Sequence, residues 1–386
     1  MNTESSASFA RRIIDWQAIH GRHDLPWQAS RDPYRIWLSE IMLQQTQVST
    51  VLGYYERFLT RFPSVVDLAA AEPGAVMALW SGLGYYSRAR NLHRCAQRVV
   101  SEFGGQFPAD RFALSSLPGI GRSTAAAIAV FAFDQREAIL DGNVKRVLCR
   151  HEAITTPAQA GATIKALWQI AEAALPMHDL PGYTQGLMDL GATLCTRSRP
   201  DCARCPVASD CRARLLGLTD QIPARRSRPA PATRRITMLV LTRRRAGHDR
   251  ADGDAREVLM VQRPDRGIWG GLLSLPESTE AVGRPLAAHL WASGLSRCAQ
   301  DPAETAATDW RVDEESAPPG ATRLLMPIDH AFTHFRLRIE PLLVDLDIGA
   351  IEPDGQGRTD LRWLRLDESD TAALPKPVRD LLGGLR

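Results

Sequence analysis

The sequence predicts a multidomain chain in which an all-α region, residues 1–220, precedes a smaller α+β domain, residues 236–386. Through the first region apolar residues recur at spacings of three and four, which is the period of an amphipathic helix. From residue 236 the pattern changes to short β-prone runs. A chain of 386 residues is also too long for one ordinary hydrophobic core, so more than one domain is expected.

Prolines and glycines separate the helical runs of the first region, and no strand-like alternation interrupts them. The runs are 9–19, 36–52, 65–79, 92–100, 123–133, 144–149, 164–175 and 183–194. The short connections between them indicate a compact helical domain.

A basic stretch, residues 221–235, joins the two regions, and it contains three prolines, five arginines and no acid. This composition predicts a stiff, extended linker. The linker is either simply solvated or in contact with a nucleic-acid backbone.

The α+β domain is predicted from runs 236–242, 257–262, 322–328 and 337–344, which are rich in β-formers. Run 286–295 opens just after Pro285 and has helical spacing. Strands together with a helix indicate a domain with its own core.

The composition is that of an ordinary globular protein, with 44% hydrophobic and 24% charged residues and a net charge of +3. The weakly basic balance permits a nucleic-acid partner without requiring one. No segment approaches the roughly 20 apolar residues of a membrane span, and residues 1–16 lack the apolar run of a signal peptide. We therefore expect a cytoplasmic monomer without a membrane partner.

Residues 117–125, LPGIGRSTA, predict a tight turn between two helices. Glycine lets the backbone adopt strained angles and approach a ligand closely, which applies to Gly119 and Gly121. Ser123 and Thr124 lie near the start of the next helix, whose unpaired N–H groups suit a phosphate. The stretch is either a helix-hairpin-helix that grips a DNA backbone or an ordinary corner between helices.

Four cysteines lie in one loop, residues 195–211, with six, two and five residues between successive members. They are Cys195, Cys202, Cys205 and Cys211. Four thiolates in a short loop bind either zinc or an iron–sulfur cluster. Structural zinc sites usually pair two close CxxC units, and only one close pair is present, so the spacing favours a structural cubane cluster.

Glu40 is a candidate general acid. A helix is predicted to begin with Asp32 as N-cap and Pro33 in its first turn, and Glu40 then shares a face with Trp37 and Leu43. A carboxyl on an apolar face loses hydration, which raises its pKa and lets it donate a proton near neutrality. The alternative is a surface glutamate at the edge of that face.

Asp141 is the second candidate carboxylate, 22 residues after Gly119 and one helix beyond the hairpin. It also fits the N-cap of the helix that starts near Val144, and capping does not exclude catalysis. A fixed carboxylate together with a separate acid is the pair that cleavage of a glycosidic bond needs.

These motifs together resemble the DNA glycosylase superfamily that includes endonuclease III, and within it the MutY family of adenine DNA glycosylases. The runs that carry the resemblance are SEIMLQQTQV (39–48), GLGYYSRARNL (82–92) and DGNVKRV (141–147), followed by WGGL (269–272) and HAFTHF (330–335). The resemblance is dense over residues of about 10–215 and resumes in the C-terminal domain.

The resemblance implies hydrolysis of adenine from A:8-oxoguanine or A:G mispairs in duplex DNA, by an enzyme with a 4Fe–4S cluster. Glu40 would protonate adenine and later activate water, Asp141 would stabilise the oxocarbenium ion and Asn143 would assist by hydrogen bonding. The implied substrate contacts are Trp27, Gln28, Leu43 and Gln185 around the flipped adenine, and Gln45 and Tyr85 as wedges in the space it leaves.

One departure concerns Ser123, which stands where endonuclease III-type enzymes carry a lysine. Serine cannot form an imine with C1′, so strand cleavage is not expected. Some adenine glycosylases have a tyrosine there. The rival functions are a bifunctional glycosylase/lyase acting on oxidised pyrimidines and a non-catalytic mismatch-binding protein.

The C-terminal domain resembles a Nudix fold, but residues 277–285 lack the glutamate-rich pattern that binds Mg²⁺ in Nudix hydrolases. We therefore expect a binding domain without hydrolase activity. Phe332, Thr333 and His334 are predicted at a hairpin tip, where they would read the N7–H that distinguishes 8-oxoguanine from guanine. The alternative is a strand with Phe332 and Phe335 at core positions.

Overall fold

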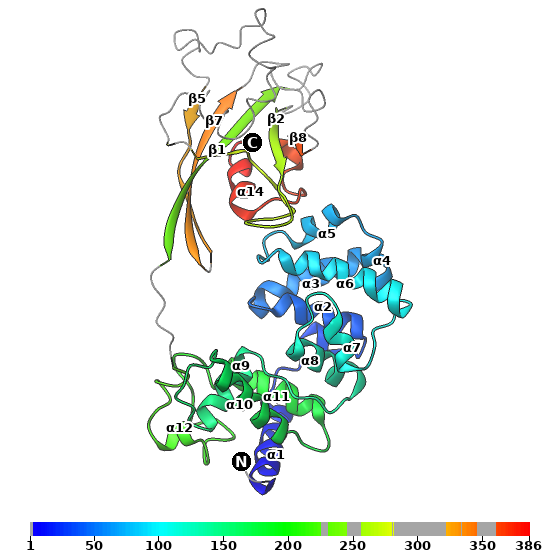
Figure 1. Ribbon diagram of the computed structural model, residues 1–386, viewed down its shortest axis with the longest axis vertical. Coiled ribbons are helices and arrows are strands. Elements are labelled where there is room, and N and C mark those ends of the chain that lie inside the picture. The colour runs from blue at the N-terminus through cyan, green and yellow to red at the C-terminus, as the bar shows by residue number, and fades with distance from the viewer. Residues whose placement is uncertain are drawn as a thin grey trace, which may run out of the picture. The chain divides into compact units, whose positions relative to one another are not determined.

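The computed structural model of the protein describes residues 3–224, 231–244, 256–279, 281, 322–332, 334–345 and 360–386, with side chains from Ser8 onward. The chain divides into two compact units, and each is described by itself (Figure 1). The first unit comprises Met1–Ala71 and Arg88–Arg228, and the second comprises Glu72–Ser87 and Pro229–Arg386.

The first unit is helical, as the periodicity predicts. Its helices are α1 (Thr3–His20), α2 (Pro33–Leu43), α3 (Val48–Arg61), α4 (Val65–Ala69), α6 (Ser87–Phe103), α7 (Arg111–Ser116), α8 (Arg122–Phe133), α9 (Gly142–His151), α10 (Gly161–Ala173), α11 (Leu180–Thr193) and α12 (Arg212–Leu215), with a 3-10 turn η1 (Pro26–Gln28). Asp32 caps α2 as predicted, because its side chain accepts a hydrogen bond from the Tyr34 N–H.

Two predicted helical runs are wrong in extent. Run 36–52 is two helices, α2 and α3, because Gln45 adopts a left-handed backbone conformation with φ of 59° and ends the helical path. Run 65–79 is α4 followed by α5 (Pro73–Trp80), and Pro73 opens the second helix because proline lacks the N–H that continuation of the first would need.

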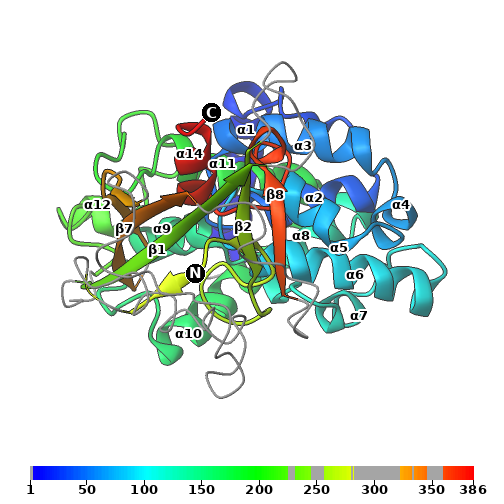
Figure 2. The ribbon, with the colours of Figure 1, turned by 90° about the horizontal axis from the view of Figure 1, so that it is seen from above.

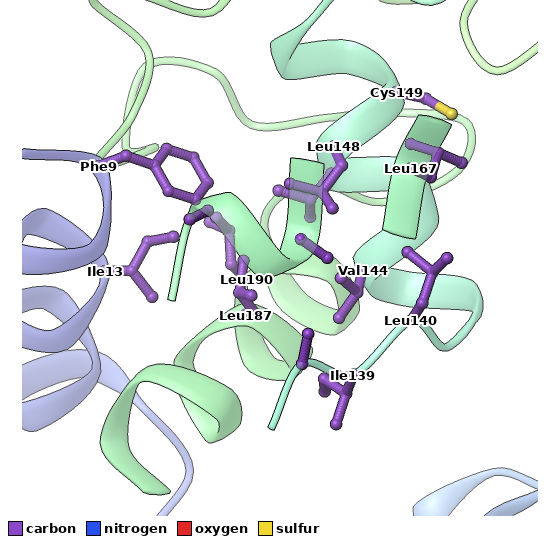
Figure 3. Packing of buried hydrophobic residues seen from close by; sticks show 14 of the residues in the cluster. Phe9, Ile13, Ile139, Leu140, Val144, Leu148, Cys149, Leu167, Leu187 and Leu190 are labelled. Carbon is purple, nitrogen blue, oxygen red and sulfur yellow. The ribbon is translucent and has the colours of Figure 1, made fainter. Parts of the chain in front are cut away.

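The core of the first unit packs α1 against α9 and α11. Figure 3 shows Phe9 and Ile13 of α1 facing Leu187 and Leu190 of α11, all of them buried. This packing fixes α11 beside α9, and each of these helices carries residues of the candidate site.

The second unit is built on a mixed sheet with the order β3-β2-β1-β7-β5. Its strands are β1 (Ala232–Arg244), β2 (Arg256–Gln262), β3 (Leu273–Ser274), β4 (Glu277–Ser278), β5 (Thr322–Leu324), β6 (Ile328–Ala331), β7 (Phe335–Asp345) and β8 (Leu361–Arg365). The long strands β1 and β7 pair in parallel, β2 lies between β1 and β8, and α14 (Lys376–Gly383) follows β8 in the chain (Figures 1 and 2).

The strand predictions need two corrections. Residues 232–235 of the predicted linker form the exposed start of β1, because β7 supplies a partner for them. Run 322–328 is divided into β5 and β6, with Pro327 just before β6, at a position where a strand tolerates a residue without an N–H. The predicted helix 286–295 lies outside the described residues.

Helix α5 groups with the second unit, where the Ser81 hydroxyl that follows it donates to the Leu374 carbonyl. The predicted boundaries at 220 and 236 did not anticipate this grouping. Among the described helices, none combines the length and apolar character that crossing a membrane requires.

Candidate active site

A cavity of about 420 Å³ in the first unit gathers five of the residues implied for the substrate site. These five are Trp27, Gln28, Glu40, Leu43 and Gln185. Apolar side chains of Ile36, Phe131 and Met188 complete much of the wall. A cavity of this size with an apolar wall and a few polar groups has the character of a small-molecule or base pocket.

Glu40 lies on α2 and places its carboxyl on the cavity wall. Burial raises its pKa to about 7, and the nearby charge of Asp141 adds to the rise. A carboxyl with this pKa is partly protonated at neutral pH, so it can act as a general acid there. The prediction that Glu40 lies on a desolvated face is confirmed in this respect.

Asp141 is the N-cap of α9, and its Oδ1 accepts a hydrogen bond of 2.7 Å from the Val144 N–H. Burial raises its pKa above the usual range, whereas the N–H groups of Val144 and Asn143 act in the opposite direction by stabilising the anion. Asp141 does not line the cavity, but its charge contributes to the raised pKa of Glu40. Burial thus raises the pKa of both carboxyls, and at Asp141 two backbone N–H groups also stabilise the anion.

Asn143 lies in the first turn of α9, where its Oδ1 accepts a hydrogen bond of 2.8 Å from Arg146. The same guanidinium donates to the carbonyls of Cys195 and Gly191. A Cβ on Gly191 would lie 2.6 Å from the Asn143 Cβ, so only glycine lets α11 pack this closely on α9. The position of Asn143 is therefore fixed by the hydrogen bond from Arg146 and by the close packing of Gly191 against it.

The predicted hairpin lies between α7 and α8. Gly119 needs to be glycine for two reasons: its φ is +80°, and an added Cβ would lie 2.9 Å from the Asn91 Cβ. Gly121 is different, because its backbone is extended and no atom lies within 4 Å of the place of a Cβ. The expectation of strained backbone thus holds for Gly119 and is wrong for Gly121, which caps α8 and leaves open space at the helix start.

The first turn of α8 is tied to both carboxylate-bearing segments. Ser123 Oγ accepts a hydrogen bond of 3.0 Å from the Leu140 N–H, next to Asp141. Thr124 Oγ1 accepts one of 3.3 Å from Gln44 Nε2, four residues after Glu40. The hydroxyl of Ser123 therefore supports the backbone before Asp141.

The two residues implied as wedges, Gln45 and Tyr85, both have positive φ, of 59° and 49°. Both side chains are exposed. A non-glycine residue in this region of conformational space carries strain, which persists where function or packing demands it.

The four cysteines of the loop line one cavity, which they share with Arg150, His151 and Leu190 among others. None of the four is in a disulfide, and Arg150 donates a 3.4 Å hydrogen bond to Cys195 Sγ. Within the described part of the chain, no three Cys, His, Asp or Glu side chains converge as the ligands of a single ion would.

β6 ends at Ala331 and pairs antiparallel with β7, which begins at Phe335, so Phe332 and His334 of the predicted hairpin tip fall between the two strands. Phe332 is half-buried and stacks on Phe335 with ring centroids 4.6 Å apart, whereas His334 is exposed. Trp269 and His330 contact the Phe332 ring from other sides. Thr333 lies outside the described residues.

Two residues that sequence reasoning missed belong to the site. Arg22 lines the cavity, and the wholly buried Asp189 binds both Arg22 and Gln185. One signal was available, because Asp189 interrupts the apolar run 183–194 on a face that packs inward. An unexplained acid on a core face indicates a buried partner.

Two family models match the chain. Residues 38–173 match the HhH-GPD superfamily of base excision DNA repair proteins, and residues 251–383 match the NUDIX domain. A solved structure of a thermostable thymine-DNA glycosylase is 29% identical, with a TM-score of 0.51, over 56% of this chain and 100% of that chain.

Curated relatives cover most of the chain. An adenine DNA glycosylase of Buchnera aphidicola subsp. Baizongia pistaciae is 38% identical over 70% of this chain and 73% of its own length. The adenine DNA glycosylase of Buchnera aphidicola subsp. Acyrthosiphon pisum is 30% identical over 97% of this chain and 96% of its own. The human adenine DNA glycosylase is 33% identical over 96% of this chain and 73% of its own.

Proposed function

Since this chain belongs to the adenine DNA glycosylases, base excision repair enzymes that hydrolyse N-glycosyl bonds, we propose that it removes adenine mispaired with 8-oxoguanine or guanine in duplex DNA. The observation that carries the proposed chemistry is the position of Glu40, a carboxyl with a pKa of about 7 on the wall of a cavity of about 420 Å³, where the charge of Asp141 adds to the rise in pKa.

In the proposed reaction the flipped adenine enters the cavity, where Trp27 and Leu43 supply apolar walls. Glu40 protonates a ring nitrogen of the leaving adenine, because the carboxyl is still protonated near neutral pH. The anion of Asp141 faces the positive charge that develops on the sugar, and Asn143 supports it. Glu40, now ionised, takes a proton from the attacking water.

In this proposal the protein contacts DNA at two places, a backbone phosphate and the gap that the flipped base leaves in the stack. The open start of α8 at Gly121 offers unpaired N–H groups to a phosphate. The exposed side chains of Gln45 and Tyr85 fill the space left by the flipped base.

The test is single-turnover adenine release from duplexes that place adenine opposite 8-oxoguanine, guanine or thymine. Release from the first two with little from A:T supports the proposal. Binding of the mispairs without any base release would favour the non-catalytic alternative.

Strand cleavage is expected to be absent, because Ser123 provides no amine for an imine with C1′. Ser123→Lys is expected to increase borohydride trapping of protein on product DNA, together with nicking. Ser123→Ala is the matched control, since it loses the same hydrogen bond from Leu140 without adding an amine. Strong trapping by the wild-type protein would revive the bifunctional alternative.

The cysteine loop is proposed to hold a structural 4Fe–4S cluster through Cys195, Cys202, Cys205 and Cys211. Their common cavity, their freedom from disulfides and the guanidinium of Arg150 on one sulfur suit an anionic thiolate cluster. A bound cluster would crosslink the loop through these four thiolates.

Purified protein is expected to contain about four irons and to be yellow-brown. Cys202→Ser is expected to lose iron, to melt at a lower temperature and to bind DNA more weakly. Cys149→Ala is the control, because this buried thiol lies on α9 outside the loop. One zinc and no iron per chain would refute the cluster.

The tip of the β6–β7 hairpin is proposed to read the lesion. Thr333→Val combined with His334→Ala is expected to lower the preference for A:8-oxoguanine over A:G by roughly 1–3 kcal/mol, the cost of an unmet polar group. Single-turnover rates on the two duplexes measure this preference, and Arg336→Ala, an exposed change on β7, is the control. An unchanged preference would assign lesion reading to another part of the chain.

A further inference from the structure

We propose that Asp189 is a positioning residue that sets the hydrogen-bond polarity of the cavity, so that a base with an amino group beside a bare ring nitrogen is accepted. A base with a carbonyl beside an N–H is rejected. The inference rests on the proposed function, in which this cavity holds the flipped adenine.

Asp189 lies on α11 with a fully buried side chain and is surrounded by donors. Its Oδ2 accepts the backbone N–H of Arg22 at 2.9 Å. Its Oδ1 accepts hydrogen bonds from Nε of Arg22 at 2.7 Å and from Nε2 of Gln185 at 2.8 Å, and Nη2 of Arg22 lies 2.7 Å from the same oxygen in an ion pair. Three hydrogen bonds and the ion pair with Arg22 occupy the two oxygens, so Asp189 acts here only as a hydrogen-bond acceptor.

The carboxylate of Asp189 fixes the orientation of the side-chain amide of Gln185. A glutamine amide has a donating NH₂ end and an accepting oxygen, and only the NH₂ end can face a group that only accepts. The oxygen Oε1 is then left on the other side, and no described residue donates to it. Because Gln185 lines the cavity, its Oε1 is available to accept a hydrogen bond from a base bound there.

Arg22 supplies the opposite polarity. Asp189 engages its Nε and Nη2, and the Nη1 donors have no acceptor among the described residues. Arg22 lines the same cavity, and 28% of its side chain is exposed. A guanidinium has no acceptor, so this donor cannot be reversed.

An acceptor from Gln185 and a donor from Arg22 complement the edge of adenine, where the C6 amino group donates and N1 accepts. Hypoxanthine has a carbonyl at C6 and an N–H at N1, which places oxygen against oxygen and N–H against N–H. Buried polar groups left unpaired in this way are the most discriminating feature a pocket can have. A single buried carboxylate thus sets both halves of the recognition.

The first test needs no variant. Single-turnover release is measured for adenine, unsubstituted purine and hypoxanthine opposite 8-oxoguanine, each rate being divided by the acid hydrolysis rate of the free deoxynucleoside. The proposed polarity predicts adenine above purine and purine above hypoxanthine, with steps of at least about tenfold. Hypoxanthine released as fast as purine, or faster, would overturn the proposal.

The second test is Asp189→Asn, which keeps the shape but adds an N–H and allows the Gln185 amide to turn. The ratio of hypoxanthine to adenine release is expected to rise at least about tenfold. A ratio measured within one protein does not depend on the fraction folded, and a thermal melt identifies a variant that does not fold at all, in which case the wild-type series decides. Asp179→Asn, at the N-cap of the same helix, is the control. An unchanged ratio in folded Asp189→Asn contradicts the role of Asp189.

Gln185→Met separates this inference from the proposed function. If it leaves adenine release unchanged, the cavity does not bind adenine and the proposed site itself is wrong. If it slows adenine release while Asp189→Asn leaves the ratio unchanged, the site stands and only the positioning role of Asp189 fails.

Discussion

Glu40→Gln is expected to slow single-turnover adenine release by at least about a hundredfold, the usual contribution of general acid–base catalysis. The amide preserves the shape of the side chain on the cavity wall but has no acidic proton to give. Binding of the mispaired duplex is expected to survive. Glu56→Gln, an exposed change on α3, is the matched control and should release adenine at the wild-type rate.

The pH dependence of adenine release is a second test of Glu40 as the general acid. Wild-type release is expected to fall as pH rises through about 7, because Glu40 loses its proton there. The residual rate of Glu40→Gln should lack this fall. A pH profile that is the same in both proteins would assign the acid to another group.

Glu40→Gln is expected to lose activity without losing stability of the folded protein above neutral pH. The pKa of Glu40 is raised from 4.5 to about 7 in the folded protein, so the folded state loses stability as pH rises from about 4.5 to about 7, and the penalty stays constant above that. Urea unfolding at pH 8 is therefore expected to show Glu40→Gln at least as stable as the wild type. Loss of both stability and activity would indicate a structural role for Glu40 instead.

Asp141→Asn is the second change with a large expected effect, again a slowing of at least about a hundredfold, because the developing positive charge loses its counter-charge. The substitution separates the two roles of Asp141. Asparagine still accepts the Val144 N–H, so the cap of α9 remains and the free energy of unfolding should change by less than about 1 kcal/mol.

Two variants calibrate that result. Asp141→Ala removes the cap as well and should cost about 1 kcal/mol of stability in addition to the activity. Asp110→Asn makes the same exchange at the cap of α7, where the side chain accepts the Ala113 N–H, and should leave release unchanged. If Asp141→Asn releases adenine at a rate near that of the wild type, Asp141 only caps α9 and has no role in the chemistry.

Much of the fold follows from local pattern. The helical runs, the caps at Asp32 and Asp141 and the change to strands near residue 236 are properties of neighbouring residues, and the structure agrees with them. The breaks at Gln45 and Pro73 were not predicted, because apolar spacing continues through both positions while the backbone does not.

The features of the candidate site also divide into those that local sequence predicts and those that depend on tertiary packing. The sequence alone determined the residue types, the desolvated face of Glu40 and the family, since motifs and periodicity are local. Only the tertiary structure decided that Ser123 supports the segment before Asp141 and that Gln185 turns its oxygen away from Asp189. Those contacts depend on packing between distant segments, Arg22 and Asp189 being 167 residues apart. A hydrogen bond across that separation leaves no period in the chain, so its direction is set only when the helices pack and the buried carboxylate must find its donors.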